Sequence, residues 1–169
     1  MAPEHLDKVI PDPGFAGDDG APDPAVTAAL AAYGRDRGGY AAALAAVQHS
    51  RVLVPVVAVL GEVEYDEQGL AHDKTSDMAT VLITGRDGRT ALLAFSSSAA
   101  LQAWNPEARP VPVTLDKAAA SAVQDGADAL LLDVAGPVML AIEGDDLRSI
   151  AAGHRLQRVE DGWGWTRPI

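Results

Sequence analysis

The first regular pattern along the chain is helical and begins near residue 24. Residues 25–33 are strong helix formers, and Asp23 and Pro24 before them suit the N-cap and the first helical position. Gly34 is expected to end this helix, because glycine is common just past a helix C-terminus. An alanine-rich segment predicts a second helix over residues 40–49.

Strand patterns follow the helices. The β-branched run at residues 51–60 predicts a buried strand. Pro55 cannot donate to a neighbouring strand, so it implies an edge, a bulge or a non-bonded position. Two strands joined by a tight turn are expected over residues 78–84 and 89–95, because Asp87 and Gly88 form a strong hairpin signal. Further strands are expected at 109–113, 129–134 and 138–143, with a short final pair around Asp161 and Gly162.

Three more helices are expected in the second half of the chain. Serines at residues 96–98 cap a helix that runs to Trp104, Thr114 caps another that ends near Gly126, and a third lies between Asp145 and Gly153. The polar residues 61–77 are expected to form a surface loop or loose hairpin. Together these elements predict an α+β fold: a mixed, largely antiparallel sheet of five or six strands with helices mainly on one face.

The stretch before the first helix has a different composition. Residues 1–23 are rich in proline, glycine and aspartate and offer little apolar surface to bury. This predicts a flexible arm over residues 1–23, followed by one domain over residues 24–169. The apolar residues Val9, Ile10 and Phe15 could dock the arm on that domain.

Charge and composition exclude several classes of function. A formal net charge of −11 with scattered basic residues argues against nucleic acid and against an anionic membrane surface as partners. The chain has no cysteine, which excludes disulfides and thiolate chemistry. No apolar run reaches the roughly 20 residues of a membrane span, and the N-terminus does not resemble a signal peptide, so a cytoplasmic location is expected.

The search for catalytic, metal and cofactor motifs gives no firm site. The four histidines are not paired at helical spacing, and no phosphate-binding glycine motif occurs, so neither a metal nor a cofactor is expected. Ser96 and Ser97 follow a strand and open a helix, as a hydrolase nucleophile would. They lack the flanking glycines of a nucleophile elbow, and helix capping explains them fully.

Aromatic residues are scarce, which draws attention to the tryptophans. Trp104 is expected to close the core beneath its helix. Trp163 and Trp165 in the tail either cover a sheet edge or form a partner surface, because tryptophan is frequent at binding hot spots.

Several segments, in their order, resemble the SseB-type N-terminal domain family. They are LVPVVA (53–58), RDGRTALLAFSS (86–97), the helix with Trp104, and ALLLDVAGPVML (129–140), and the resemblance covers roughly residues 25–153. It implies a compact α+β domain with no established enzymatic activity. The chain departs from the family in having Ser96 for the usual threonine, and residues 133–136 for an Asn-Pro-Gly stretch.

The first hypothesis is therefore a non-enzymatic cytoplasmic protein-interaction or binding module whose partner, a protein or a small ligand, is unknown. Its groove is expected where two strands end beside helix N-termini, at Phe95, Ser96, Ser97, Asp133 and Gly136. The alternative is an amino-acid sensor that receives a carboxylate at the helix N-terminus near residues 96–98. A third hypothesis, a hydrolase with Ser96 or Ser97 as its nucleophile, is disfavoured by the missing elbow glycines.

Overall fold

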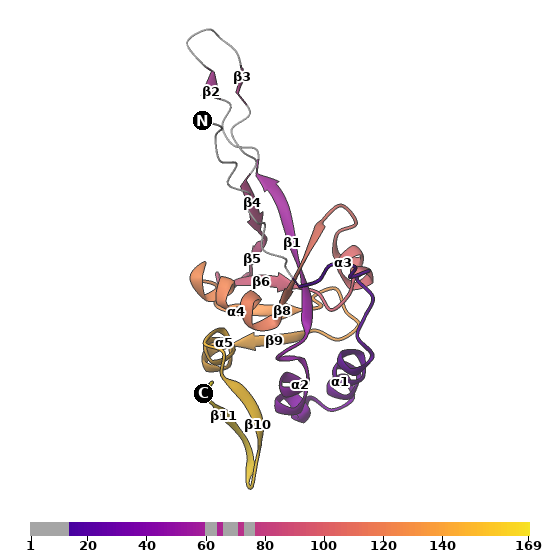
Figure 1. Cartoon of the computed structure of the whole chain (residues 1–169), viewed down its shortest axis with the longest axis vertical. Helices are drawn as coiled ribbons and strands as arrows, with labels where there is room; N and C mark the ends of the chain where they lie inside the picture. Colours follow the sequence, from indigo (N-terminus) through magenta and orange to yellow (C-terminus); the bar gives the residue numbers. More distant parts are fainter. Residues whose placement is uncertain (1–13, 60–63, 66–70, 73–76) are drawn as a thin grey trace, which may run out of the picture.

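The computed structural model describes residues 14–59, 64–65, 71–72 and 77–169 (Figure 1). The helices are α1 (Pro24–Arg35), η1 (Arg37–Gly39, a 3-10 turn), α2 (Tyr40–Val47), α3 (Ser98–Trp104), α4 (Leu115–Gln124) and α5 (Gly144–Ala151). The strands are β1 (Arg51–Val59), β2 (Glu64–Tyr65), β3 (Ala71–His72), β4 (Asp77–Thr80), β5 (Leu82–Thr84), β6 (Thr90–Ala94), β7 (Arg109–Thr114), β8 (Ala129–Leu132), β9 (Leu140–Glu143), β10 (Arg155–Val159) and β11 (Gly162–Thr166).

The α+β class is confirmed, but the single sheet of five or six strands is wrong. The strands form a three-stranded sheet β4-β1-β7, a four-stranded sheet β5-β6-β8-β9 and the hairpins β2-β3 and β10-β11. Their pairings are antiparallel except for β6 with β8. The predicted strand over 78–84 is divided at Val81, and its halves pair with β1 and with β6 respectively. Residues 77–84 thus contribute one short strand to each of the two larger sheets.

The two larger sheets meet at a single bridge. The N–H of Leu53 in β1 donates to the carbonyl of Phe95 at 2.7 Å, and the N–H of Phe95 donates to the carbonyl of Leu53 at 2.8 Å. Figure 1 shows β1 crossing the strands β6 and β8 at a steep angle. Phe95, the residue after β6, therefore sits where the sheets cross.

Prolines explain how the three-stranded sheet is arranged. Pro55 of the central strand β1 lies opposite Pro110 of β7, and Pro112 lies opposite Leu53. Two prolines cannot exchange backbone hydrogen bonds, so this register places Pro55 at a non-bonded position, one of the three predicted alternatives. In the same register the nitrogens of Pro110 and Pro112 face the outer edge of β7. That edge is thereby protected from pairing with another chain.

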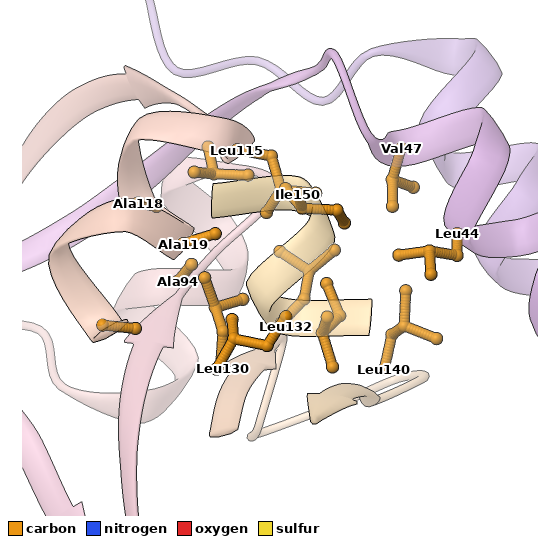
Figure 2. Packing of buried hydrophobic residues seen from close by; sticks show 14 of the residues in the cluster. Leu44, Val47, Ala94, Leu115, Ala118, Ala119, Leu130, Leu132, Leu140 and Ile150 are labelled. Carbon is orange, nitrogen blue, oxygen red and sulfur yellow. The ribbon is translucent and has the colours of Figure 1, made fainter. Parts of the chain in front are cut away.

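The main core lies on one face of the four-stranded sheet. Leu92, Leu130 and Ile142 are opposite one another across β6, β8 and β9, and Ala94, Leu132 and Leu140 form the next row. These residues are buried against α1, α2, α4 and α5, as Figure 2 shows in part. The other face carries Leu93 and Phe95, which pack with α3. Four helices therefore pack on one face of this sheet and α3 packs on the other, so the helices lie mainly on one face, as predicted.

Helix α1 begins as predicted but does not end at Gly34. The Asp23 carboxylate accepts from the N–H of Ala25 at 2.8 Å, which caps the helix. The helix continues through Gly34 to Arg35 because this glycine serves close packing: a Cβ there would lie 2.8 Å from Cγ2 of Val138. Asp36 then ends the helix, and its side chain accepts from the N–H of Gly38.

Most of the remaining local predictions agree with the structure, although Thr114 precedes α4 without a capping hydrogen bond from its side chain. The turn at Asp87 and Gly88 joins β5 to β6, with Gly88 at a φ of 81°. Ser97 caps α3, and the tail forms the hairpin β10-β11 around Asp161 and Gly162. Within residues 61–77, β2 and β3 pair as a short hairpin, and the rest of that segment lies mostly outside the described residues.

The tail hairpin is held to α2 by a buried glutamine. The Gln48 side chain is 4% exposed; its Oε1 accepts from the N–H of Leu156 at 2.7 Å, and its Nε2 donates to the Leu156 carbonyl at 2.8 Å. The amide thus pairs with β10 much as a neighbouring strand would. No helix in the described part of the chain combines the length and hydropathy needed to cross a membrane.

Candidate functional site

The candidate site lies where β6 and β8 end. These strands are parallel neighbours, with Ala94 opposite Leu132, so both chains leave the sheet at the same edge. The N–H of Asp133 donates to the carbonyl of Ala94 at 3.0 Å. The segments that begin at Ser96 and at Asp133, separated by 37 positions in the sequence, therefore lie side by side.

Ser96 and Asp133 are joined by two hydrogen bonds. The Ser96 N–H donates to Oδ1 of Asp133 at 2.8 Å, and the Ser96 hydroxyl donates to Oδ2 at 2.6 Å. Asp133 is only 2% exposed and has a φ of 57°, in the left-handed region that aspartate tolerates better than most residues. Its carbonyl accepts from the N–H of Gly136 at 2.9 Å, which closes the loop that follows β8.

The electrostatic state of Asp133 is set mainly by burial. Removal from water raises the pKa of its carboxyl above the ordinary value of 3.8, and the hydrogen bonds from Ser96 offset this only in part. No described lysine, arginine or histidine forms an ion pair with it. The structure thus keeps a largely desolvated carboxylate that has no ion-pair partner among the described residues.

This raised pKa predicts a characteristic pH dependence of stability. The folded state holds the Asp133 proton more tightly than the unfolded chain, so protonation stabilises the fold. The contribution to the free energy of unfolding is greatest below pH 3.8, and it falls as the pH rises from there through the folded-state pKa. We expect wild type to gain stability relative to Asp133→Asn on acidification, as measured by urea unfolding from about pH 7 to about pH 3.

Other carboxylates also titrate in that range, so the test is the difference between the two proteins. Asp161→Asn, in the exposed turn of the tail hairpin, is the matched control and should show a smaller difference from wild type. A difference between wild type and Asp133→Asn that is flat, or that grows in the opposite direction, would contradict the raised pKa.

A groove of about 580 Å³ opens beside this pair. Most of its walls are small apolar side chains from α1, α3 and the loop after β8. The described lining residues are Pro22, Thr27, Leu30, Ala31, Ser96, Ser97, Ala99, Ala100, Ala103, Asp133, Ala135, Gly136, Pro137 and Val138. The groove is thus an apolar cleft with a single acidic residue in its wall.

One wall of the groove is held in place by Arg51. Its guanidinium pairs with the Asp18 carboxylate at 2.7 Å and donates to the carbonyls of Ala21 and Ser96 at 2.6 and 2.8 Å. Residues 18–22, which we term the strap, are bound in this way to β1 and to the start of α3. The strap belongs to the sequence predicted to be a flexible arm; residues 1–13 of that arm lie outside the described residues.

Gly20 permits the close approach of the strap to α3. Its φ is 72°, its carbonyl accepts from the N–H of Ser98 at 2.8 Å, and a Cβ there would lie 1.9 Å from the Ser98 hydroxyl. Sequence analysis gave no role to Arg51, the strap or the α1 wall. An isolated arginine at the start of a strand carries no local signal of such a contact.

The predicted site residues do not all lie in the groove. Ser96, Ser97, Asp133 and Gly136 line it, whereas Phe95 does not. Phe95 is fully buried and stacks on Trp104 with ring centroids 5.6 Å apart. Because its side chain is buried, Phe95 supports the site from below and is not accessible to a ligand in the groove.

The tail tryptophans lie far along the chain from these residues and are half-buried against the main core. The indole N–H of Trp165 donates to Asp146 at 3.3 Å, and the guanidinium of Arg158 lies 5.4 Å from the centre of the Trp163 ring. Burial and the nearby Asp146 carboxylate together raise the pKa of Tyr40. Both tryptophans therefore pack the hairpin on the domain, and a partner surface there remains a prediction.

The start of α3 has few free donors for an anionic ligand. The N–H of Ser98 is bound by Gly20, and that of Ala100 by the Ser97 hydroxyl. The N–H of Ser96 is bound by Asp133. The carboxylate that the sensor hypothesis places here would have to displace these internal partners and approach the Asp133 carboxylate.

Clustered metal ligands and histidines are absent from the groove as far as the described residues show. The described part of the chain contains no group of three or more histidine, aspartate or glutamate side chains able to hold a metal ion. His49 is exposed and His154 half-buried, and neither lines the groove. The side chains of His5 and His72 lie outside the described residues.

Comparison with family models gives a match that covers more than half of the chain. The family model described as the SseB protein N-terminal domain matches residues 26–149, a span that holds every described groove residue except Pro22. No curated protein and no solved structure matches the chain.

Proposed function

Starting from the fact that the chain belongs to the SseB N-terminal domain family, we propose that it is a non-enzymatic, cytoplasmic binding module that engages a partner protein through its groove. The observation that carries this proposal is the groove itself. It combines about 580 Å³ of mostly apolar space with polar groups that already bond to one another. Apolar clefts with a few placed polar groups are the usual form of a binding site.

The arrangement of Ser96 supports binding over catalysis. A serine nucleophile needs a base that takes its proton and a third group that orients the base. Here the Ser96 hydroxyl donates to a carboxylate, and none of the described lining residues is a histidine. The amino-acid sensor has less support, because the N–H groups of residues 96, 98 and 100 at this helix start already donate to internal partners.

A variant pair tests whether a partner depends on the groove. Ala103→Arg places a long charged side chain on the groove face of α3, whereas Ala120→Arg makes the same change on an exposed position of α4 outside the groove. Both variants should fold as wild type does. We expect a partner captured from lysate of the native organism to bind Ala103→Arg at least roughly ten-fold more weakly, and Ala120→Arg unchanged.

The affinities are measured with the purified partner by calorimetry. A partner lost equally from both variants, or from neither, would show that the groove is not the binding surface. An ester-hydrolysing activity abolished by Ser96→Ala would overturn the non-enzymatic part of the proposal.

A further inference from the structure

The polar wall of the groove presents a hydrogen-bond acceptor. Ser96 has one hydroxyl hydrogen, which it donates to Oδ2 of Asp133 at 2.6 Å. Toward the groove, the Ser96 oxygen can therefore act only as a hydrogen-bond acceptor, through its lone pairs. Donation to a carboxylate makes this oxygen a stronger acceptor, because hydrogen bonds in a chain polarise one another.

The carboxylate behind this oxygen has hydrogen bonds from Ser96 but no ion-pair partner among the described residues. Asp133 itself is 2% exposed. A buried anion in an apolar setting is stabilised when a cation approaches it. Burial raises the pKa of this carboxyl, and the hydrogen bonds from Ser96 offset that rise only in part.

The apolar walls of the groove favour a particular shape of cationic ligand. Leu30, Ala100, Ala103 and Val138 form apolar walls that suit an unbranched alkyl chain. Asp133 is 2% exposed and each of its oxygens accepts from Ser96, so the carboxylate does not present an open edge to the paired donors of a guanidinium in the groove. An ammonium, which acts as a compact charge with rotatable donors, matches a single acceptor better.

We propose that the groove binds a lysine side chain of a basic partner protein, whose ammonium donates to the Ser96 hydroxyl oxygen beside Asp133. The alkyl stem of the lysine lies against the α1 and α3 walls. The net charge of −11 favours encounter with a basic partner. This inference rests on the proposed function and adds to it the chemistry of the partner.

The test uses three probes of equal length: pentylammonium, pentanol and pentanoate. Each is titrated into ¹⁵N-labelled full-length protein at neutral pH, and dissociation constants are taken from the amide shifts of groove residues such as Ser96, Ala135 and Gly136. In wild type we expect pentylammonium to bind at least roughly ten-fold more tightly than pentanol, and pentanoate to bind most weakly.

Two variants assign this preference to the proposed groups. Asp133→Asn keeps a side chain that tolerates the left-handed backbone and removes the charge, so it should reduce the preference to below about three-fold. Ser96→Ala removes the acceptor and should also reduce it. Asp161→Asn, which has the same change of charge in the exposed hairpin turn, should retain the wild-type preference.

The outcomes separate this inference from the proposed function. If pentanol and pentylammonium bind the groove equally, or if Asp133→Asn keeps the preference, the lysine proposal is overturned while the groove remains a binding site. If pentanoate binds most tightly, the lysine proposal also fails and the amino-acid sensor gains support. If the amide shifts of the groove residues respond to none of the probes, the lysine proposal fails, and the Ala103→Arg and Ala120→Arg pair alone decides whether the groove binds a partner.

Discussion

Phe95→Ala is expected to lower the free energy of unfolding by about 3–5 kcal/mol, among the largest effects of a single substitution in this chain. Phe95 is fully buried at the point where the two larger sheets meet. Its ring stacks on Trp104 and packs with Leu53, Leu93 and Leu101. Truncation to alanine leaves a cavity that rigid neighbours on several elements cannot fill by relaxing.

Urea unfolding followed by circular dichroism measures this loss, and the fluorescence of Trp104 should change because its stacking partner is gone. Val123→Ala, which trims an apolar side chain 42% exposed on α4, is the control and should cost less than about 0.5 kcal/mol. A cost for Phe95→Ala close to that of the control would show that Phe95 is not a packing centre. If Phe95→Ala stays folded but binds pentylammonium more weakly, Phe95 instead contributes to the binding groove.

Gln48→Leu is expected to destabilise the protein by about 2–4 kcal/mol, although leucine is similar in size and more hydrophobic. The substitution leaves the N–H and the carbonyl of Leu156 without their bonds to the glutamine amide. Both groups lie in a buried contact, where each unsatisfied polar group costs about 1–3 kcal/mol. The added apolar surface of leucine offsets only part of this cost.

Equilibrium unfolding gives the overall change, and native-state hydrogen exchange shows where it acts. We expect protection to fall first in β10 and β11, because Gln48 joins this hairpin to α2. Gln124→Leu, at the exposed end of α4, is the matched control and should leave both measurements nearly unchanged. Unaltered exchange in the hairpin together with an unaltered midpoint would show that the Gln48 bonds contribute little.

One side of the candidate site could be predicted from the sequence. Ser96, Ser97, Asp133 and Gly136 were named because they follow two expected strands, and the parallel pairing of β6 and β8 brings them together. The α1 wall and the strap were missed. Their contribution depends on Arg51, whose partners in the strap are some 30 positions away in the sequence. No local pattern encodes a contact over that distance.

The sequence by itself determined the elements whose signals are local. The start of α1 depends on Asp23 and Pro24, adjacent residues that satisfy or spare the first helical N–H groups. The turn between β5 and β6 depends on Gly88, which adopts a positive φ without steric cost. Such interactions span a few residues, so they hold in any tertiary context.

Tertiary structure alone decided the features that depend on distant partners. Three such features join segments far apart in the sequence. Residues 77–84 are divided between two sheets, and α1 continues past Gly34, which packs closely against Val138. Gln48 pairs with Leu156. The groove is of the same kind, because its walls come from four separate stretches of chain. Long-range packing chooses among arrangements that local propensity permits equally, and the Ser96–Asp133 pair acquires its chemistry only from the burial that this packing produces.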